Sequence, residues 1–185
     1  GASLAAVKDG KCVNTSMGFT PLAGVMMGTR CGDVDPSIMP YLCNKLDKTP
    51  QEMLDIYNKK SGMLGVSGIS SDARDIEEAY NAGNEAAIIT TNLYVNRIVN
   101  VVGGYYAQLG GADAIVFTGG IGENDTKMRS YILDGIKDAF GIEYNVELNA
   151  KSRGKELLLS TEESKVQVWL IPTDEELMIA RDTYA

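Results

Sequence analysis

A short apolar run that leads through glycines into a helical pattern constrains the fold more than any other feature of this chain. Residues 114–117 (AIVF) predict a buried strand, and residues 118–124 (TGGIGEN) place a glycine-rich turn directly after it. Apolar side chains at helical spacing, from Met128 to Phe140, then predict a helix. A strand joined to a helix by a tight turn is a building unit of α/β folds, so the chain is expected to belong to that class.

Around this unit the sequence predicts a hairpin near the start and helices alternating with strands elsewhere. Asp9 and Gly10 tolerate the positive φ of a tight turn between two short strand patterns. Capping boxes at residues 49–52 and 173–176 indicate two helix starts. The expected elements are strands 3–7 and 11–15, a glycine-rich loop 17–36, helices 49–61, 70–83 and 85–109, strand 114–117, a helix through 128–140, strand 166–172 and a helix from 173. Together they predict an α/β domain with a mixed sheet.

Length and charge limit the classes of protein to consider. The chain has 185 residues, of which 44% are hydrophobic and 23% charged, so we expect one folded domain. Its formal net charge is −8, whereas binders of nucleic acid or anionic membranes carry basic surfaces. No apolar run is long enough to span a membrane, and three cysteines without CxxC spacing indicate free thiols in a reducing compartment. We therefore expect a cytoplasmic protein with no nucleic-acid or membrane partner.

The sequence contains no histidine, which limits the chemistry more than any other count. A Ser-His-Asp or Cys-His triad and a histidine-ligated zinc site are both excluded. Acid–base chemistry would have to use carboxylates, lysine or tyrosine. The alternative is chemistry that depends on positioning and charge instead of proton transfer.

Two glycine-rich segments are candidates for contact with phosphate. In residues 118–124 the glycines would let the backbone approach a nucleotide closely, although a plain strand-to-helix turn explains them equally well. The segment matches neither a Walker A loop nor a dinucleotide fingerprint. In residues 28–35, Arg30 lies between glycines and could reach a phosphoryl group with its planar fork. The alternative is an Arg30 side chain held by Asp33 or Asp35.

Two acidic segments at helix starts are open to more than one interpretation. Glu176 occupies the capping-box position, which leaves Glu175 free to face a ligand such as Mg²⁺, although acidic residues there usually just complement the helix dipole. In residues 70–74 (SSDAR), the plain interpretation is a helix N-cap followed by Asp72 and Arg74 on different helix faces.

Four segments, taken together, resemble the acetate kinase family. They are NTSMGFTPLAGVMMGTR with GDVDP at residues 14–36, SGISSDARD at 67–75, TGGIGEN at 118–124 and IPTDEEL at 171–177. They occur in the family's order and extend over nearly the whole chain, and the first is highly specific. The resemblance implies the actin-like ATPase fold, which is ribonuclease H-like and is shared by acetate and sugar kinases, heat-shock ATPases and actin.

The resemblance also implies an activity and a set of site residues. The activity is reversible, Mg²⁺-dependent phosphoryl transfer from ATP to acetate, giving acetyl phosphate and ADP, in a homodimer that serves acetyl-CoA biosynthesis. Arg30 looks like the catalytic arginine, and Glu175 looks like the Mg²⁺ carboxylate. The residues that look like the nucleotide pocket are Gly1, Asp72, Ala73, Arg74, Gly119, Gly120, Ile121, Gly122, Glu123 and Asn124.

In this family an N-terminal domain precedes the matching region, and Gly1 looks like the last glycine of its phosphate loop. We therefore expect residues 1–185 to be a single C-terminal, nucleotide-binding and dimerising domain, with the N-terminal domain absent and catalysis incomplete without it. Two alternatives stay open: the corresponding half of a propionate kinase, which shares these motifs, and a nucleotide-binding or dimerisation module that performs no chemistry.

Overall fold

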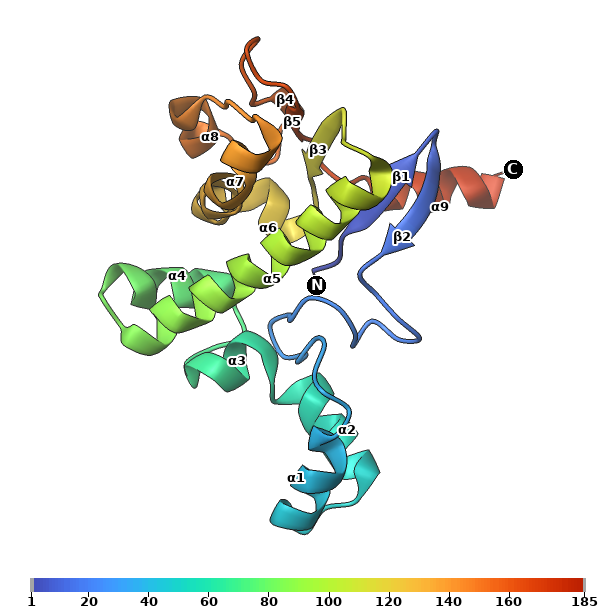
Figure 1. Cartoon of the computed structure of the whole chain (residues 1–185), viewed down its shortest axis with the longest axis vertical. Helices are drawn as coiled ribbons and strands as arrows, with labels where there is room; N and C mark the ends of the chain where they lie inside the picture. The colour runs from blue at the N-terminus through green and yellow to red at the C-terminus, as the bar shows by residue number, and fades with distance from the viewer. Residues whose placement is uncertain (1, 185) are drawn as a thin grey trace. The chain divides into compact units, whose positions relative to one another are not determined.

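The computed structural model describes residues 2–184, so the predicted nucleotide residue Gly1 lies outside the described residues. The chain forms two compact units, Gly1–Gly110 and Gly111–Ala185, which are described separately below (Figure 1). This division does not test the expectation of a single domain, which stays a prediction, because one domain can contain two compact units.

The first unit begins with the predicted hairpin. Strands β1 (Ala5–Lys8) and β2 (Lys11–Thr15) pair antiparallel. The turn between them places Asp9 at φ 51° and Gly10 at φ 73°. Both values lie in the left-handed region that a two-residue hairpin turn requires, which confirms the interpretation of this dipeptide.

Five helices follow a long irregular loop in the first unit. They are α1 (Ile38–Leu46), α2 (Pro50–Lys59), α3 (Gly62–Ser67), α4 (Ala73–Asn81) and α5 (Glu85–Leu109). The capping box at Thr49 is confirmed, since its side chain accepts from the backbone N–H of Glu52 while the Glu52 carboxylate accepts from the backbone N–H of Thr49. The sequence analysis missed α1 and α3: α1 contains Pro40, and α3 has only six residues, two of them glycine.

Methionine and aromatic side chains form much of the core of the first unit. The fully or nearly fully buried apolar residues include Val25, Met26, Met27, Met53, Tyr57, Met63, Ile76, Tyr94 and Ile98. The buried residues of helix α5 lie between Ala87 and Ile98, and α3 and α4 pack against this helix. Unbranched methionine side chains fill irregular gaps, which suits a core that lies beneath a loop instead of beneath a regular sheet.

The second unit contains a three-stranded sheet in the order β3-β5-β4, from β3 (Ala114–Phe117), β5 (Gln167–Leu170) and β4 (Leu157–Leu158). Strand β5 pairs parallel with β3 and antiparallel with β4, so the predicted mixed sheet is confirmed. Helices α6 (Gly119–Asn124), α7 (Thr126–Phe140), α8 (Val146–Lys151) and α9 (Glu175–Tyr184) complete the unit. One face of α7 supplies the buried side chains Met128, Ile132, Leu133, Ile136 and Phe140.

Two local predictions in the second unit are wrong. The glycine-rich segment after β3 forms a short helix of six residues, α6, and not a turn. The start of α9 has no capping box at Thr173, because the backbone N–H of Leu177 donates to Asp174 Oδ1 at 3.0 Å. Asp174 is therefore the residue that caps α9. Among the residues that the structure describes, no helix has the length and apolar character needed to cross a membrane.

Candidate active site

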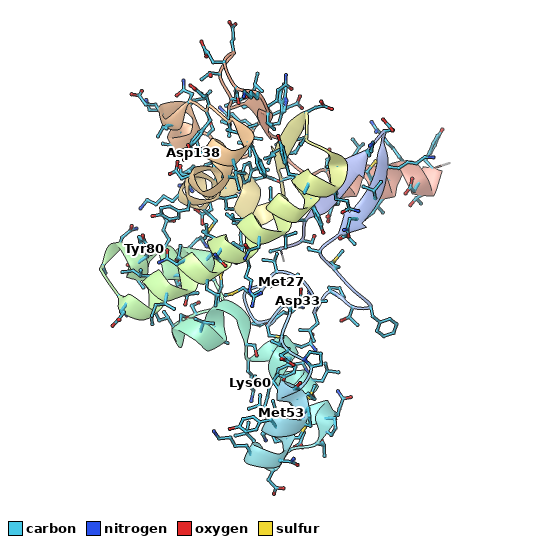
Figure 2. The ribbon with its side chains drawn as sticks, viewed as in Figure 1. Met27, Asp33, Met53, Lys60, Tyr80 and Asp138 are labelled. Carbon is cyan, nitrogen blue, oxygen red and sulfur yellow. The ribbon has the colours of Figure 1, made fainter. Side chains whose placement is uncertain are left out.

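The loop that carries Arg30 is fixed by backbone hydrogen bonds to the junction of α2 and α3. The N–H groups of Ser61, Met63 and Leu64 donate to the carbonyls of Thr29, Met27 and Gly28, each at 2.9 Å. Figure 2 labels Met27 and Asp33, which precede and follow Arg30 in this loop. These bonds define the position from which the Arg30 side chain projects.

Gly62 makes this close approach possible. Its φ is +61°, and a Cβ atom added there would collide with the Met27 carbonyl oxygen and lie 2.7 Å from the Arg30 carbonyl oxygen. Any L-residue would suffer both the strain of the left-handed backbone and this overlap. The sequence requires glycine at this position so that α3 can begin against the loop.

The half-buried side chain of Arg30 has very few protein partners. Its Nη1 atom lies 3.5 Å from the Met27 sulfur, and among the described residues it forms no ion pair. Asp33 Oδ1 accepts instead from the Gly24 N–H, and Asp35 Oδ1 accepts from the Ser37 N–H, both at 2.8 Å. The alternative in which these carboxylates hold Arg30 is therefore wrong, and the guanidinium keeps most of its donors for an anionic ligand.

Asp72 and Arg74 form a closed pair at the start of α4. Asp72 is the N-cap, and its Oδ1 accepts from the Arg74 backbone N–H at 2.9 Å. The Arg74 guanidinium folds back, with Nε 3.0 Å from Oδ1 and Nη2 2.5 Å from Oδ2. The expectation of two side chains on different helix faces is wrong, because Asp72 precedes the helix and so lies within reach. The Arg74 side chain lowers the pKa of Asp72 from 3.8 to about 2.

The Arg30 loop and the start of α4 are brought together within the first unit. A Cβ atom added to Gly28 would lie 2.5 Å from the carbonyl oxygen of Ser71, the residue before Asp72. This contact leaves no room for a side chain between the two segments. Ala73, the first residue of α4, is half-buried there. The two groups predicted separately thus share one region of the unit.

In the second unit the predicted glycines have different surroundings. Gly119 has φ +69°, and no atom lies within 4 Å of a Cβ atom added at Gly119 or Gly120, so the backbone is open at both. Gly122 instead packs against β3, where an added Cβ would lie 3.3 Å from the Phe117 carbonyl carbon. Asn124 Nδ2 donates to the Gly120 carbonyl at 3.1 Å and closes α6 on itself. Ile121 is half-buried, and its carbonyl accepts from the N–H of Asp125, the residue that ends α6, at 2.9 Å.

Glu123 connects the glycine segment to the start of α9. Its Oε1 atom accepts from the N–H of Gly119 and the N–H of Thr173, both at 2.8 Å, and from Thr173 Oγ1 at 3.0 Å. The Thr173 N–H is the main reason that the pKa of Glu123 lies below its ordinary value. A residue predicted to contact nucleotide therefore also has a structural role, which the sequence pattern gave no means to anticipate.

Glu175 is the first residue of α9, and its side chain is exposed. The described residues contain no group of three or more acidic or cysteine side chains that could hold a metal by themselves. A single carboxylate nevertheless suits Mg²⁺, which keeps several waters and combines one or two carboxylates with substrate phosphates. Because Asp174 caps the helix, the Glu175 carboxylate is the one with the oxygen donors that Mg²⁺ prefers and without a capping role.

Sequence analysis missed Arg129, the largest fully buried side chain among the residues that the structure describes. It lies on α7 in register with the buried residues Ile132, Leu133 and Ile136, at the spacing of one helix face. A charged residue at a position where the pattern demands an apolar one was the available signal. Its partners include the carbonyl of Gly122, in the predicted nucleotide segment.

The comparison with protein families decides where this chain belongs, since the model of the acetokinase family matches residues 1–181. The chain belongs to the acetokinase family. An acetate kinase of Clostridium botulinum is 55% identical over 183 residues, which are 99% of this chain and 46% of that protein. The chain thus spans about half the length of the curated relatives that it matches.

Solved structures in this family share the fold. An acetate kinase of Porphyromonas gingivalis superimposes with a TM-score of 0.94 at 47% identity, covering 100% of this chain and 46% of the other. A propionate kinase of Francisella tularensis gives a TM-score of 0.90 at 36% identity, covering 97% and 45%. The α/β fold with a mixed sheet is therefore the fold of these kinases, in agreement with the predicted actin-like ATPase class.

Proposed function

We propose that this chain is the nucleotide-binding and dimerising half of an ATP:acetate phosphotransferase, which converts acetate and ATP to acetyl phosphate and ADP reversibly. The observation that carries the proposal is the family match over residues 1–181, together with a 55% identical acetate kinase. Because those relatives are about twice as long, we propose that the isolated chain binds nucleotide and that turnover needs the remaining half. A cytoplasmic homodimer completes the proposal.

The proposed chemistry needs positioning and charge and no general base. A carboxylate acceptor is already ionised at neutral pH, so its oxygen can attack the γ-phosphorus without losing a proton. Arg30 would hold the oxygens of the transferring phosphoryl group through its planar fork. Support comes from its unpaired donors, since the described residues give it only the weak contact with the Met27 sulfur.

The proposed nucleotide contacts are considered for each unit by itself. In the second unit, the open space beside Gly119 and Gly120 would let a flat group of the nucleotide lie against the backbone. In the first unit, Asp72, Ala73 and Arg74 would contribute from the start of α4, where the paired side chains are exposed. Gly1 belongs to the proposed pocket through the family resemblance alone.

Mg²⁺ is part of the proposal, with Glu175 as the carboxylate that holds it. The ion would neutralise phosphate charge and polarise the phosphoryl oxygens. The support is the exposed carboxylate at the first turn of α9, whose neighbour Asp174 is already engaged as the helix cap.

Propionate is the second candidate substrate. A propionate kinase shares the fold with a TM-score of 0.90, but its identity of 36% is lower than the 47% of the P. gingivalis acetate kinase. Acetate is therefore favoured. A third candidate, a nucleotide-binding or dimerisation module without chemistry, describes the isolated chain if the remaining half is never supplied.

Calorimetric titration of this chain with ADP tests the proposal, with and without Mg²⁺. We expect saturable binding at one site per chain that strengthens when Mg²⁺ is present. Buffer without nucleotide is the control for dilution heat, and inorganic pyrophosphate is the control for nonspecific anion binding. A chain that is folded by circular dichroism and binds no ADP would contradict the nucleotide role.

A further inference from the structure

Arg129 is buried completely, and its guanidinium is surrounded by oxygen acceptors that are not carboxylates. Nε donates to Asn149 Oδ1 at 2.8 Å, and Nη2 donates to the carbonyls of Ser152 at 2.6 Å and Asn149 at 3.2 Å. Nη1 donates to the Gly122 carbonyl at 2.8 Å. Among the described residues no carboxylate forms an ion pair with it.

A buried cation without a carboxylate partner is costly, so its retention needs a reason. Burial lowers the pKa of Arg129, and the negative charge of Asp125 partly opposes this effect. Arginine stays protonated even so, because its ordinary pKa lies far above neutral pH. An apolar side chain of similar size would fill the same space in α7 without that desolvation penalty. What it could not do is donate several hydrogen bonds in different directions.

One of those hydrogen bonds goes to the glycine segment, residues 119–124, through the Gly122 carbonyl. The last carbonyls of a helix need partners, and three carbonyls at the end of α6 have them. Ile121 accepts from the N–H of the C-cap Asp125, Gly122 accepts from Arg129 Nη1, and Glu123 accepts from the Gly154 N–H. Of these three donors only Arg129 is a side chain. Its other hydrogen bonds go to the end of α8, so the guanidinium fastens α6 to a second, separate helix.

We propose that Arg129 is a positioning residue for the nucleotide site. By holding the Gly122 carbonyl, it fixes the backbone of Gly119 and Gly120 in the open conformation that receives the nucleotide. It does not touch the nucleotide, because it has no exposed surface. This inference rests on the proposed function of the glycine segment, and it adds a residue outside the family motifs that the sequence displays.

A buried arginine could equally serve only the stability of the core, and the two roles predict different results. A purely structural role predicts that ADP binding weakens only as far as the unit is destabilised. A positioning role predicts weaker binding at equal stability, together with loosening confined to residues 119–124. The test therefore compares Arg129→Lys with Leu133→Ala, which removes buried atoms from the same helix and no hydrogen bond of the segment.

The variants are compared by ADP calorimetry, urea unfolding and amide hydrogen exchange on the full chain. For Arg129→Lys, ADP affinity should fall roughly tenfold, the size expected when one charge-assisted hydrogen bond is lost. Exchange at residues 119–124 should accelerate more than elsewhere. For Leu133→Ala, the urea midpoint should fall while ADP affinity stays within about twofold of the parent. Equal ADP affinity in Arg129→Lys and the parent, or equal losses in both variants, would overturn the proposal.

The parent chain supplies a test that does not depend on a variant folding. The ¹⁵N resonance of the Arg129 side chain should shift when ADP saturates the chain, although the side chain is buried away from solvent. An unchanged resonance at saturation would refute positioning. If the parent binds no ADP, the proposed function fails by itself, and the exchange comparison then decides whether Arg129 orders residues 119–124 more than Leu133 does.

Discussion

At the scale of single residues, the two arginines of the first unit that the family motifs single out have opposite environments. Arg74 forms three charge-assisted hydrogen bonds with Asp72, whereas Arg30 has, among the described residues, only a weak contact with a thioether. A guanidinium that is already paired has fewer N–H donors left for a phosphate. The arrangement therefore favours Arg30, and not Arg74, as the group that stabilises charge on a transferring phosphoryl.

This contrast predicts the effect of Arg30→Ala. In an active enzyme assembled with the remaining half, turnover should fall roughly 10³-fold, since a transition-state arginine is worth about 10³–10⁵ in related phosphoryl transfers. ADP affinity should change little, because the contribution is made in the transition state. Steady-state kinetics and ADP calorimetry measure the two quantities. Arg30→Lys is the matched control, and full activity in Arg30→Ala would reject the assignment.

The Asp72–Arg74 pair predicts a pH dependence. The pKa of Asp72 is lowered to about 2 by Arg74, so the ionised cap is favoured in the folded chain. Its contribution to stability is present above the ordinary pKa of 3.8 and is lost as the pH falls through about 2. Arg74→Ala should return the pKa of Asp72 toward 3.8, as measured by a ¹³C carboxyl titration. Because the pair is exposed, high salt should weaken the shift in the parent chain.

The Mg²⁺ carboxylate is tested through Glu175. Glu175→Gln should raise the Mg²⁺ concentration that gives half-maximal activity in the assembled enzyme, because an amide is a weaker ligand for a hard cation than a carboxylate. Glu176→Gln, the neighbouring change on the same exposed turn, is the control and should leave the Mg²⁺ titration unchanged. Identical Mg²⁺ titrations for Glu175→Gln and the parent would remove Glu175 from the proposal.

At the scale of elements, replacing glycine by alanine should have opposite effects on stability in two helices. Gly62 begins α3 with φ +61° and no space for a Cβ, whereas Gly104 lies within α5 with no atom within 4 Å of an added Cβ. Gly62→Ala should cost at least about 2 kcal/mol, from the left-handed backbone and the overlap with the Arg30 loop. Gly104→Ala should stabilise by about 0.5–1 kcal/mol through helix propensity. Urea unfolding of the two variants measures both, and a Gly62→Ala chain as stable as the parent would contradict the close approach.

Sequence patterns predicted the elements that carry local signals. Asp9-Gly10, the Thr49 capping box and the long periodic stretch of α5 all correspond to features of the structure. Helix α3 was missed because its stability comes from contacts with a distant loop and not from its six residues. The same limit applies to the site. The motifs nominated Glu123, but its bond to Thr173 joins residues 50 positions apart and has no local pattern.

At the scale of the whole molecule, the chain spans about half the length of the curated relatives that it matches. It matches 46% of the C. botulinum acetate kinase and carries the residues that we assign to nucleotide, Mg²⁺ and phosphoryl stabilisation. Phosphoryl transfer also needs an acceptor held in line and water excluded from it. A half that supplies only one side of this arrangement is expected to bind without turning over.

That expectation is tested by supplying acetate and Mg-ATP and trapping acetyl phosphate with hydroxylamine. The chain alone should give no product above a protein-free blank. Adding a separately prepared N-terminal half of a close relative should give product that rises with the amount added. Replacing acetate by propionate in the same assay compares the two candidate substrates. Robust product from the chain alone would show that the chain is catalytically complete.

The contact between Arg30 and the Met27 sulfur, 3.5 Å long, also has a practical consequence for handling the protein. A thioether is a weak hydrogen-bond acceptor, but peroxide converts it to a sulfoxide, whose oxygen is a strong one. Oxidised Met27 would then hold the guanidinium in place by a bond that a phosphate must break. Because Met27 is only 6% exposed, this oxidation should be slow in the folded chain. Fresh and peroxide-treated samples, compared in the same activity assay, would show whether one added oxygen atom blocks Arg30.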